Sequence, residues 1–278
     1  MKISLFCSSI RPHLWNPLLD SLKSNKLEYE VVMAGFIDEA LSLDITNQYP
    51  EFKYIKTGDI KPAQCYEIAR KACTGDLIGW ISDDCIFSES ALDKIYEYYN
   101  LNLHMIFRNF VFAVKNTDKE CENNDLNDQR FFPRNLNTPQ VATIGFMNRE
   151  YLDSLGGLDN RYVYGKWEVD ICMRVLEDNG KIIKLEDIEV QIEHTQKNGH
   201  NTNDWSGVNE DSETLENSWV IGGYKDFERP LVYFDMGQPV YYFPISNREV
   251  TLRRLDKFNP YELPISLEES QSLRARWV

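Results

Sequence analysis

The order of apolar and polar residues along the first hundred positions alternates between two periodicities. Apolar runs at residues 3–7 and 77–81 have the length and composition of buried strands, and further strands are expected at 29–33 and 52–55. Between them, leucines at positions 14, 18, 19 and 22 recur at helical spacing, and helices are expected over 62–73 and 89–99. This alternation predicts an α/β fold in which a mostly parallel central sheet is flanked by helices.

The pattern after residue 101 is less regular. We expect strands over 104–114, 141–147, 181–185 and 188–192, a helix over 167–178, and a long polar loop over 116–137. Residues 196–217 are polar and form a long connection for a compact domain. Such loops often act as lids, so we expect this stretch to close over a ligand through Trp205 or His200, with a plain linker as the alternative. The aromatic-rich tail is expected to contain a strand at 241–243 and a short helix at 250–257.

Polar residues follow the first and the fourth predicted strands. Ser8, Ser9 and Arg11 come after the first strand, and Ser82, Asp83 and Asp84 come after the fourth. Ligands of open α/β sheets bind beyond the carboxyl ends of the strands. The two turns are therefore expected to lie on the same edge and to form a binding site.

Composition and charge argue against several classes of binding protein. The 278 residues include 30 Lys and Arg against 44 Asp and Glu, which gives a net charge of −14. Proteins that bind nucleic acid or a membrane surface through basic segments are thereby disfavoured. We find no apolar run of the ~18–20 residues that a spanning helix needs and no signal peptide, so we expect a cytoplasmic protein. The six cysteines show no metal-ligand spacing and are expected to be reduced.

Acidic residues mark two places where chemistry could occur. Asp83 and Asp84 end a buried strand, where adjacent carboxylates suit Mg²⁺ or Mn²⁺, although a solvated turn that caps the next helix is the alternative. Glu168 and Asp170 open a helix, either as favourable charges at its N-terminus or as a base aimed into a cleft. His194 ends another apolar strand and could join a carboxylate-bound metal.

These acids belong to a longer series of short motifs. In chain order the motifs are KPAQ at 61–64, GDLI at 75–78, SDD at 82–84, GFMNR at 145–149, GGLD at 156–159 and EVDICMR at 168–174, followed by Gly180 and His194. Their order and spacing resemble the inverting family-two glycosyltransferases of the GT-A fold. The resemblance covers roughly residues 1–195. It implies a donor half over about 1–100 and an acceptor half over about 101–195. We expect residues 196–278 to form a mobile loop and a C-terminal extension packed on the same domain.

The resemblance implies a role for the acids near residue 84. Asp84 stands where the family has the last acid of its DXD motif, the main ligand of Mn²⁺ or Mg²⁺. Asp83 takes the middle position, near the ribose or the diphosphate, and Ser82 replaces the usual first Asp. His194 matches a histidine that completes the metal shell in some members.

The resemblance also implies a catalytic base and a donor. Glu168 falls where the family has its base, with Trp167 in place of the preceding acid. Asp170 is the alternative base, and Arg174 can pair with Asp170 one turn away. The nucleotide of a nucleoside-diphosphate sugar would be held by Ser8, Ser9, Arg11, Asp59, Lys61 and Gln64. The sugar would pass to a glycan or another hydroxyl acceptor.

Two rival functions share this architecture. A non-catalytic carbohydrate-binding protein on a degenerate GT-A fold is favoured by Ser82 and Trp167, which depart from the family motifs. A sugar nucleotidyltransferase would normally carry a glycine-rich loop near the N-terminus, and residues 8–16 contain no glycine.

Overall fold

The computed structural model describes residues 1–37, 39–58, 60–103, 109–118, 121–125, 142–159, 161–178, 180–192, 206–220 and 245–246. The helices are the short 3₁₀ turn η1 (Pro12–Leu14), α1 (Trp15–Leu22), α2 (Glu39–Gln48), α3 (Pro62–Lys71), α4 (Ala91–Leu103), α5 (Arg149–Ser154), α6 (Trp167–Glu177) and α7 (Ser206–Ser218). The strands are β1 (Ile3–Ser8), β2 (Tyr29–Gly35), β3 (Phe52–Lys56), β4 (Leu77–Trp80), β5 (Cys85–Phe87), β6 (Phe110–Asp118), β7 (Cys121–Asp125), β8 (Gly145–Asn148), β9 (Lys181–Ile192), β10 (Trp219–Val220) and β11 (Ile245–Ser246).

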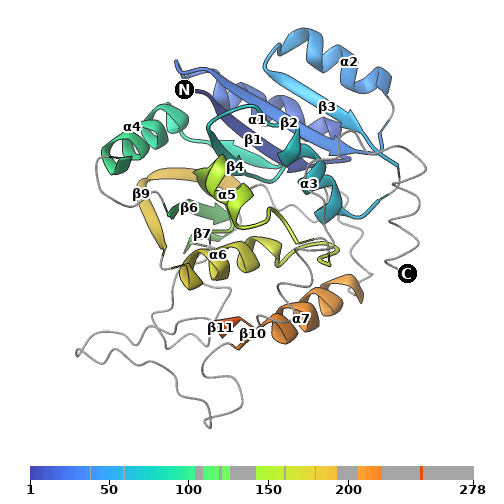
Figure 1. Cartoon of the computed structure of the whole chain (residues 1–278). Helices are drawn as coiled ribbons and strands as arrows, with labels where there is room; N and C mark the ends of the chain where they lie inside the picture. The colour runs from blue at the N-terminus through green and yellow to red at the C-terminus, as the bar shows by residue number, and fades with distance from the viewer. Residues whose placement is uncertain are drawn as a thin grey trace.

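Nine strands form one sheet in the order β3-β2-β1-β4-β8-β6-β9-β5, with β7 paired to β6 (Figure 1). The first four strands of this order are parallel, as the alternating pattern predicts. Beyond β4 the sheet is mixed, because β8 runs antiparallel to both β4 and β6. The predicted α/β class with a helix-flanked sheet is confirmed, and the parallel pairing is concentrated in the N-terminal half.

Alternate residues of the central strands enter two separate hydrophobic cores. On β1, Leu5 and Cys7 face a core that includes α1 and α4, whereas Phe6 faces a core that includes α3, α5 and α6. The same division appears on β6, where Phe112 and Val111 lie on opposite faces. Strands buried on both faces appear in the sequence as continuous apolar runs, which is why these segments could be predicted.

Two glycines make space for aromatic rings between the paired strands β4 and β8. Gly79 lies opposite Phe146, and Trp80 lies opposite Gly145. A Cβ atom on Gly79 would come within 2.4 Å of the Phe146 ring, and one on Gly145 within 2.3 Å of the Trp80 ring. The missing side chains therefore make room for Trp80, which lines the cavity described below.

Several segments differ from their sequence expectations. Residues 116–118 and 121–125 are paired strand and not loop. Pairing of β6 with β9 supports residues 116–118, and pairing of β7 with β6 supports residues 121–125, in spite of the low strand propensity of Asn and Asp. Residues 181–192 form one strand where two were expected, and the acidic pair Glu186-Asp187 falls in a register shift of the β6–β9 ladder. The helices α2 and α5 and the strand β5 were not expected. Residues 206–217, expected as part of a polar loop, belong to helix α7, and the closure of this stretch over a ligand stays a prediction.

Some expectations fall on other parts of the chain. The strand expected at 241–243, the helix expected at 250–257, and His200 and Trp205 lie outside the described residues. Among the described side chains, Cys7, Cys65, Cys73, Cys85 and Cys172 are buried thiols that form no disulfide. No helix in the described ranges is both long and apolar enough to cross a membrane.

Candidate functional site

The two polar turns predicted to share an edge do meet, and they meet through Arg11. The Arg11 guanidinium donates from Nε to Asp83 Oδ2 at 3.1 Å and also pairs with Asp83 Oδ1. Its Nη2 atom donates to Asp84 Oδ2 at 3.2 Å. Arg11 thus bridges both carboxylates that follow β4.

Ser9 and Ser82 complete the hydrogen bonding of these carboxylates. Ser9 Oγ donates to Asp83 Oδ2 at 2.6 Å and accepts from Trp15 Nε1 at 2.7 Å, so the start of α1 fixes its orientation. Ser82 Oγ donates to the remaining oxygen of Asp84. Each of the four carboxylate oxygens therefore accepts a hydrogen bond from this chain.

The pairing of Arg11 with the acids is largely screened from solvent. The side chains of Arg11, Asp83 and Asp84 are 14%, 5% and 1% exposed. Burial lowers the pKa of Arg11, but the hydrogen bonds and charges of Asp83 and Asp84 outweigh it and raise the pKa overall. The guanidinium is therefore a permanent positive charge held between two buried negative charges.

Asp83 and Asp84 could bind a divalent metal only after a rearrangement of Arg11. Carboxylate oxygens suit Mn²⁺ and Mg²⁺, but here a guanidinium occupies the position of a cation. Across the described part of the chain, no three His, Cys, Asp or Glu side chains are grouped to hold a metal ion. His194, the other expected ligand, lies outside the described residues. A metal fits only where Arg11 moves off the acids and a further ligand joins them.

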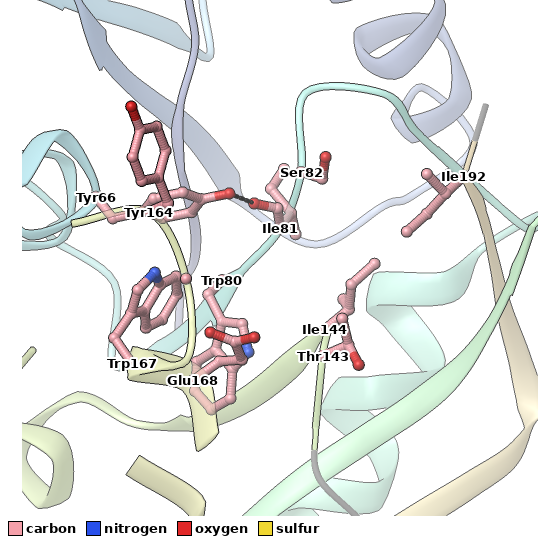
Figure 2. Close-up of a pocket in the computed structure, with 11 residues that line it drawn as sticks. Tyr66, Trp80, Ile81, Ser82, Thr143, Ile144, Tyr164, Trp167, Glu168 and Ile192 are labelled. Carbon is pink, nitrogen blue, oxygen red and sulfur yellow. Dashed lines mark hydrogen bonds between the residues drawn. The ribbon is translucent and has the colours of Figure 1, made fainter. Parts of the chain in front are cut away.

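A cavity of about 200 Å³ lies between the end of β4 and the start of α6. Its lining includes Ser82, from the acidic turn, and Glu168, from the first turn of α6, so the cavity connects the two motifs (Figure 2). Tyr66, Trp80, Tyr164 and Trp167 provide aromatic walls. The cavity is thus lined mainly by apolar groups, together with one carboxylate from the start of a helix.

The aromatic walls are held by contacts with one another and with the backbone. The ring centroids of Tyr66 and Trp167 lie 4.7 Å apart, and those of Trp80 and Trp167 lie 6.2 Å apart. The Tyr66 hydroxyl donates a hydrogen bond to the Ile81 carbonyl at 2.8 Å, and this bond is drawn in Figure 2. Trp167 therefore packs as part of the wall beside Glu168.

Asp170 occupies a different environment from Glu168. Asp170 is 1% exposed, and its Oδ2 atom lies 3.0 Å from Arg174 Nη2, so the expected pairing one turn along α6 is present. Arg174 also donates to the Leu155 carbonyl at 2.6 Å. Asp170 does not belong to the described residues that line the cavity, whereas Glu168 does. Of these two acids, Glu168 is the one placed to contact a ligand in the cavity.

The remaining donor-binding candidates lie near this site in varied settings. Ser8 ends β1 beside Ala34 of β2. Gln64 is buried, and its Oε1 atom accepts from the Lys61 backbone N–H at 3.2 Å, which caps α3. Lys61 Nζ lies 5.5 Å from the centroid of the Tyr164 ring. Asp59 lies outside the described residues. The donor-binding roles of these residues stay predictions.

Sequence reasoning did not select three aromatic residues of this site: Tyr66, Trp80 and Tyr164. A signal existed for Trp80, because alternation along β4 places it on the same face as Ile78 and directs it toward α6. Tyr66 and Tyr164 gave no such signal, since their contact with the cavity depends on how α3 and the loop before α6 come together.

The fold is that of the GT-A glycosyltransferases. TarS of S. aureus (residues 1–349) superposes with a TM-score of 0.55 at 16% identity, covering 69% of this chain and 60% of that chain. The same protein in complex with UDP-GlcNAc gives a TM-score of 0.53 at 15% identity, covering 72% and 61%. GalNAc-T7 with UDP, GalNAc and Mn²⁺ gives a TM-score of 0.56 at 12% identity, covering 78% and 48%.

These likenesses concern the fold. This chain spans less than two thirds of the length of each of these solved chains. No protein-family model and no curated protein sequence matches the chain.

Proposed function

We propose that this protein is a glycosyltransferase that moves a sugar from a nucleoside-diphosphate sugar to a hydroxyl group of a glycan or another acceptor. The observation that carries the proposal is the cavity that joins the acidic turn at Ser82 to Glu168. The GT-A fold supports it, as do the UDP-GlcNAc complex of TarS and the UDP complex of GalNAc-T7 among the structural neighbours.

The donor half of the site is suited to a diphosphate through Arg11. The guanidinium already bridges two carboxylates, and the same planar group of donors can bind phosphate oxygens in two-point contacts. A bound Mn²⁺ or Mg²⁺, held by Asp84 together with His194, would stabilise charge on the leaving diphosphate as a Lewis acid. Release of Arg11 from the acids would then let it face the donor.

We assign the role of general base to Glu168, in a single displacement that inverts the anomeric carbon. The acceptor oxygen forms a bond to the anomeric carbon as the bond from that carbon to the diphosphate oxygen breaks. The Glu168 carboxylate accepts the proton of the acceptor hydroxyl, and the nucleoside diphosphate leaves with the electron pair. The apolar walls around Glu168 keep bulk water away from the reacting atoms.

The test of this function is the Glu168→Gln variant. The amide keeps the size of the side chain but cannot accept the proton, so transfer should fall by about 10²–10⁴-fold. Donor affinity, measured by calorimetry, should stay near that of the wild type. Sugar transfer is measured with a panel of nucleoside-diphosphate sugars and hydroxyl acceptors, with and without Mn²⁺.

Two further variants sharpen this test. Glu150→Gln removes an exposed acid from the first turn of α5 and should leave transfer unchanged. Asp170→Asn breaks the buried pair with Arg174, so stability and activity should fall together. A fully active Glu168→Gln beside a folded but inactive Asp170→Asn would reverse the two roles.

A carbohydrate-binding protein without catalysis is the second candidate. The bridging of Asp83 and Asp84 by Arg11 favours it, because a neutralised acid pair has less need of a metal. Measurement of donor hydrolysis in Mn²⁺ separates the two candidates: a binding protein retains the sugar nucleotide intact, whereas a transferase hydrolyses it slowly without acceptor.

A further inference from the structure

One buried acid outside the motifs makes an unusual set of contacts. Asp211, in α7, is 1% exposed and accepts three backbone hydrogen bonds. Its Oδ1 atom accepts from Val163 N at 2.7 Å, and its Oδ2 atom accepts from Tyr164 N and Gly165 N, both at 2.8 Å. We call this arrangement, the Asp211 carboxylate with the amides of residues 163–165, the Asp211 clasp.

The segment held by the clasp contacts both the candidate site and helix α3. Tyr164 and Gly165 line the cavity that contains Glu168. The carbonyl of Val163 accepts from the Ala63 N–H in the first turn of α3 at 3.0 Å. The clasp therefore connects α7 with the start of α3 and with the cavity wall.

The residue that follows the clasp has a strained backbone. Lys166 adopts a positive φ of 65°, in the left-handed region that residues with a side chain rarely adopt. Its carbonyl accepts from Asp170 N at 3.0 Å, in the first turn of α6. Such conformations persist where the surrounding structure holds them, and the Asp211 clasp holds the chain immediately before this one. The turn at Lys166 sets the direction in which α6 begins, two residues before Glu168.

From this geometry we propose that Asp211 is a positioning residue for Glu168. The inference rests on the proposed function, and it extends the site into a helix beyond the region of family resemblance. Burial raises the pKa of Asp211, and its three backbone hydrogen bonds lower it in part. Charge-assisted bonds to three successive amides fix a loop more firmly than neutral bonds would. By fixing residues 163–165, Asp211 holds the α6 start and the Tyr164 wall in the arrangement that transfer requires.

The Asp211→Asn variant of the full chain tests this role. The amide nitrogen is a donor facing donor N–H groups, so the clasp loses part of its bonding while α7 keeps its side-chain volume. Exchange of the amides of Val163, Tyr164 and Gly165 with deuterated solvent should accelerate at least about tenfold. The value of kcat should fall by about 10–100-fold with little change in donor KM, since a displacement of about 1 Å can cost 10²-fold.

One measuring condition and two control variants separate an effect on positioning from an effect on stability. Rates are taken at least about 10 °C below the melting temperature of each variant, so that all are folded. Glu213→Gln, an exposed acid on the same helix, should leave both exchange and kcat unchanged. Ser218→Ala removes a hydroxyl that accepts from Arg161 Nη2 at 2.6 Å, and so weakens the docking of α7 without touching the clasp. Its kcat should stay near that of the wild type.

The outcomes separate this inference from the proposed function. Wild-type exchange rates in Asp211→Asn would overturn the clasp whether or not the protein transfers sugar. Wild-type kcat in a folded Asp211→Asn, or an equal loss in Ser218→Ala, would overturn the positioning role. Complete inactivity of the wild type toward every donor would overturn the proposed function and, with it, the catalytic part of this inference. Should Asp211→Asn not fold, Asp211→Glu, which keeps the charge but shifts the carboxylate, takes its place with the same criteria.

Discussion

Arg11 is the residue whose behaviour most changes the interpretation of the acidic turn. Its guanidinium lies against Asp83 and Asp84, whose side chains are 5% and 1% exposed, and so balances two charges that would otherwise repel. A metal ion at this position would also neutralise these two carboxylates. The Arg11 guanidinium and a metal ion would therefore compete for the same carboxylates, and substitution of Arg11 makes this competition measurable.

We predict that Arg11→Ala lowers the melting temperature and makes the protein more responsive to Mn²⁺. Removal of one partner from a buried ion pair costs about 3–5 kcal/mol, because an uncompensated charge remains. Mn²⁺ should then raise the melting temperature of Arg11→Ala by more than it raises that of the wild type, since a ligand of the folded state stabilises it. Differential scanning calorimetry with and without Mn²⁺ provides the comparison.

The control for this prediction is an ion pair on the surface. Lys23 and Asp20, 2.6 Å apart, are each 55% exposed, and Lys23→Ala should change neither stability nor the response to Mn²⁺ appreciably. An equal Mn²⁺ shift in wild type and Arg11→Ala would count against metal binding by the acid pair.

At the scale of elements, a single carboxylate ties β1 and β2 to the turn before β4. Glu30 accepts from Ser4 Oγ at 2.5 Å, from Lys2 Nζ at 2.9 Å, and from the backbone N–H of Thr74 at 2.6 Å. Burial raises the pKa of Glu30, but these hydrogen bonds outweigh it and lower the pKa to about 2. The network thus fixes the amino ends of the strands whose carboxyl ends form the site.

This network predicts a dependence of stability on acid pH. The folded pKa of Glu30 is lowered, so its contribution is complete above its unfolded value near 4.5 and is lost as pH falls toward about 2. The loss is on the order of 2–3 kcal/mol. Urea unfolding between pH 7 and pH 2 should give a shallower acid decline for Glu30→Gln than for the wild type.

A neighbouring acid provides the control for this pH experiment. Glu28 lies 3.9 Å from the same Lys2 ammonium but is 75% exposed, so Glu28→Gln should decline as the wild type does. The assignment fails if Glu30→Gln and the wild type lose stability in parallel.

At the scale of the whole molecule, the two cores protect the cysteines. Cys7 and Cys85 lie in the core on the α1 side, and Cys65, Cys73 and Cys172 lie in the core on the α3 side. Burial raises the pKa of Cys172 to about 12 and raises that of Cys7 and Cys85 well above the ordinary thiol value. Both accessibility and thiolate fraction are therefore low in the folded state.

We predict that these five thiols react with iodoacetamide at pH 8 only as fast as the protein unfolds. Mass spectrometry of Cys121→Ser, which retains only the buried five, gives the cleanest measurement. Moderate denaturant should accelerate all five together, because both cores share one sheet. Rapid alkylation of any of them in native protein would contradict their burial.

Some elements could be predicted from the sequence because almost all of their residues are apolar and buried. The run at 77–81 is apolar throughout, and the runs at 3–7 and 29–33 contain one polar residue each, a composition typical of strands covered on both faces. Others could not: residues 121–125 read CENND, yet they pair as β7 because the neighbouring β6 offers a ladder. Propensity is a weak signal where a partner strand supplies the hydrogen bonds.

The contacts of the candidate site can also be sorted into those that the sequence predicts and those that only the tertiary structure sets. The sequence by itself determined that Ser9, Arg11, Asp83 and Asp84 share an edge, because chain order and strand direction place the ends of parallel neighbours together. It also determined the i, i+4 pairing of Asp170 with Arg174, which needs only a helix. Tertiary structure alone decided that Arg11 bridges both acids, and that Asp211 grips residues 163–165 from 46 to 48 positions away. Contacts of that kind depend on how separate elements pack, and local patterns of polarity carry no information about which distant groups will meet.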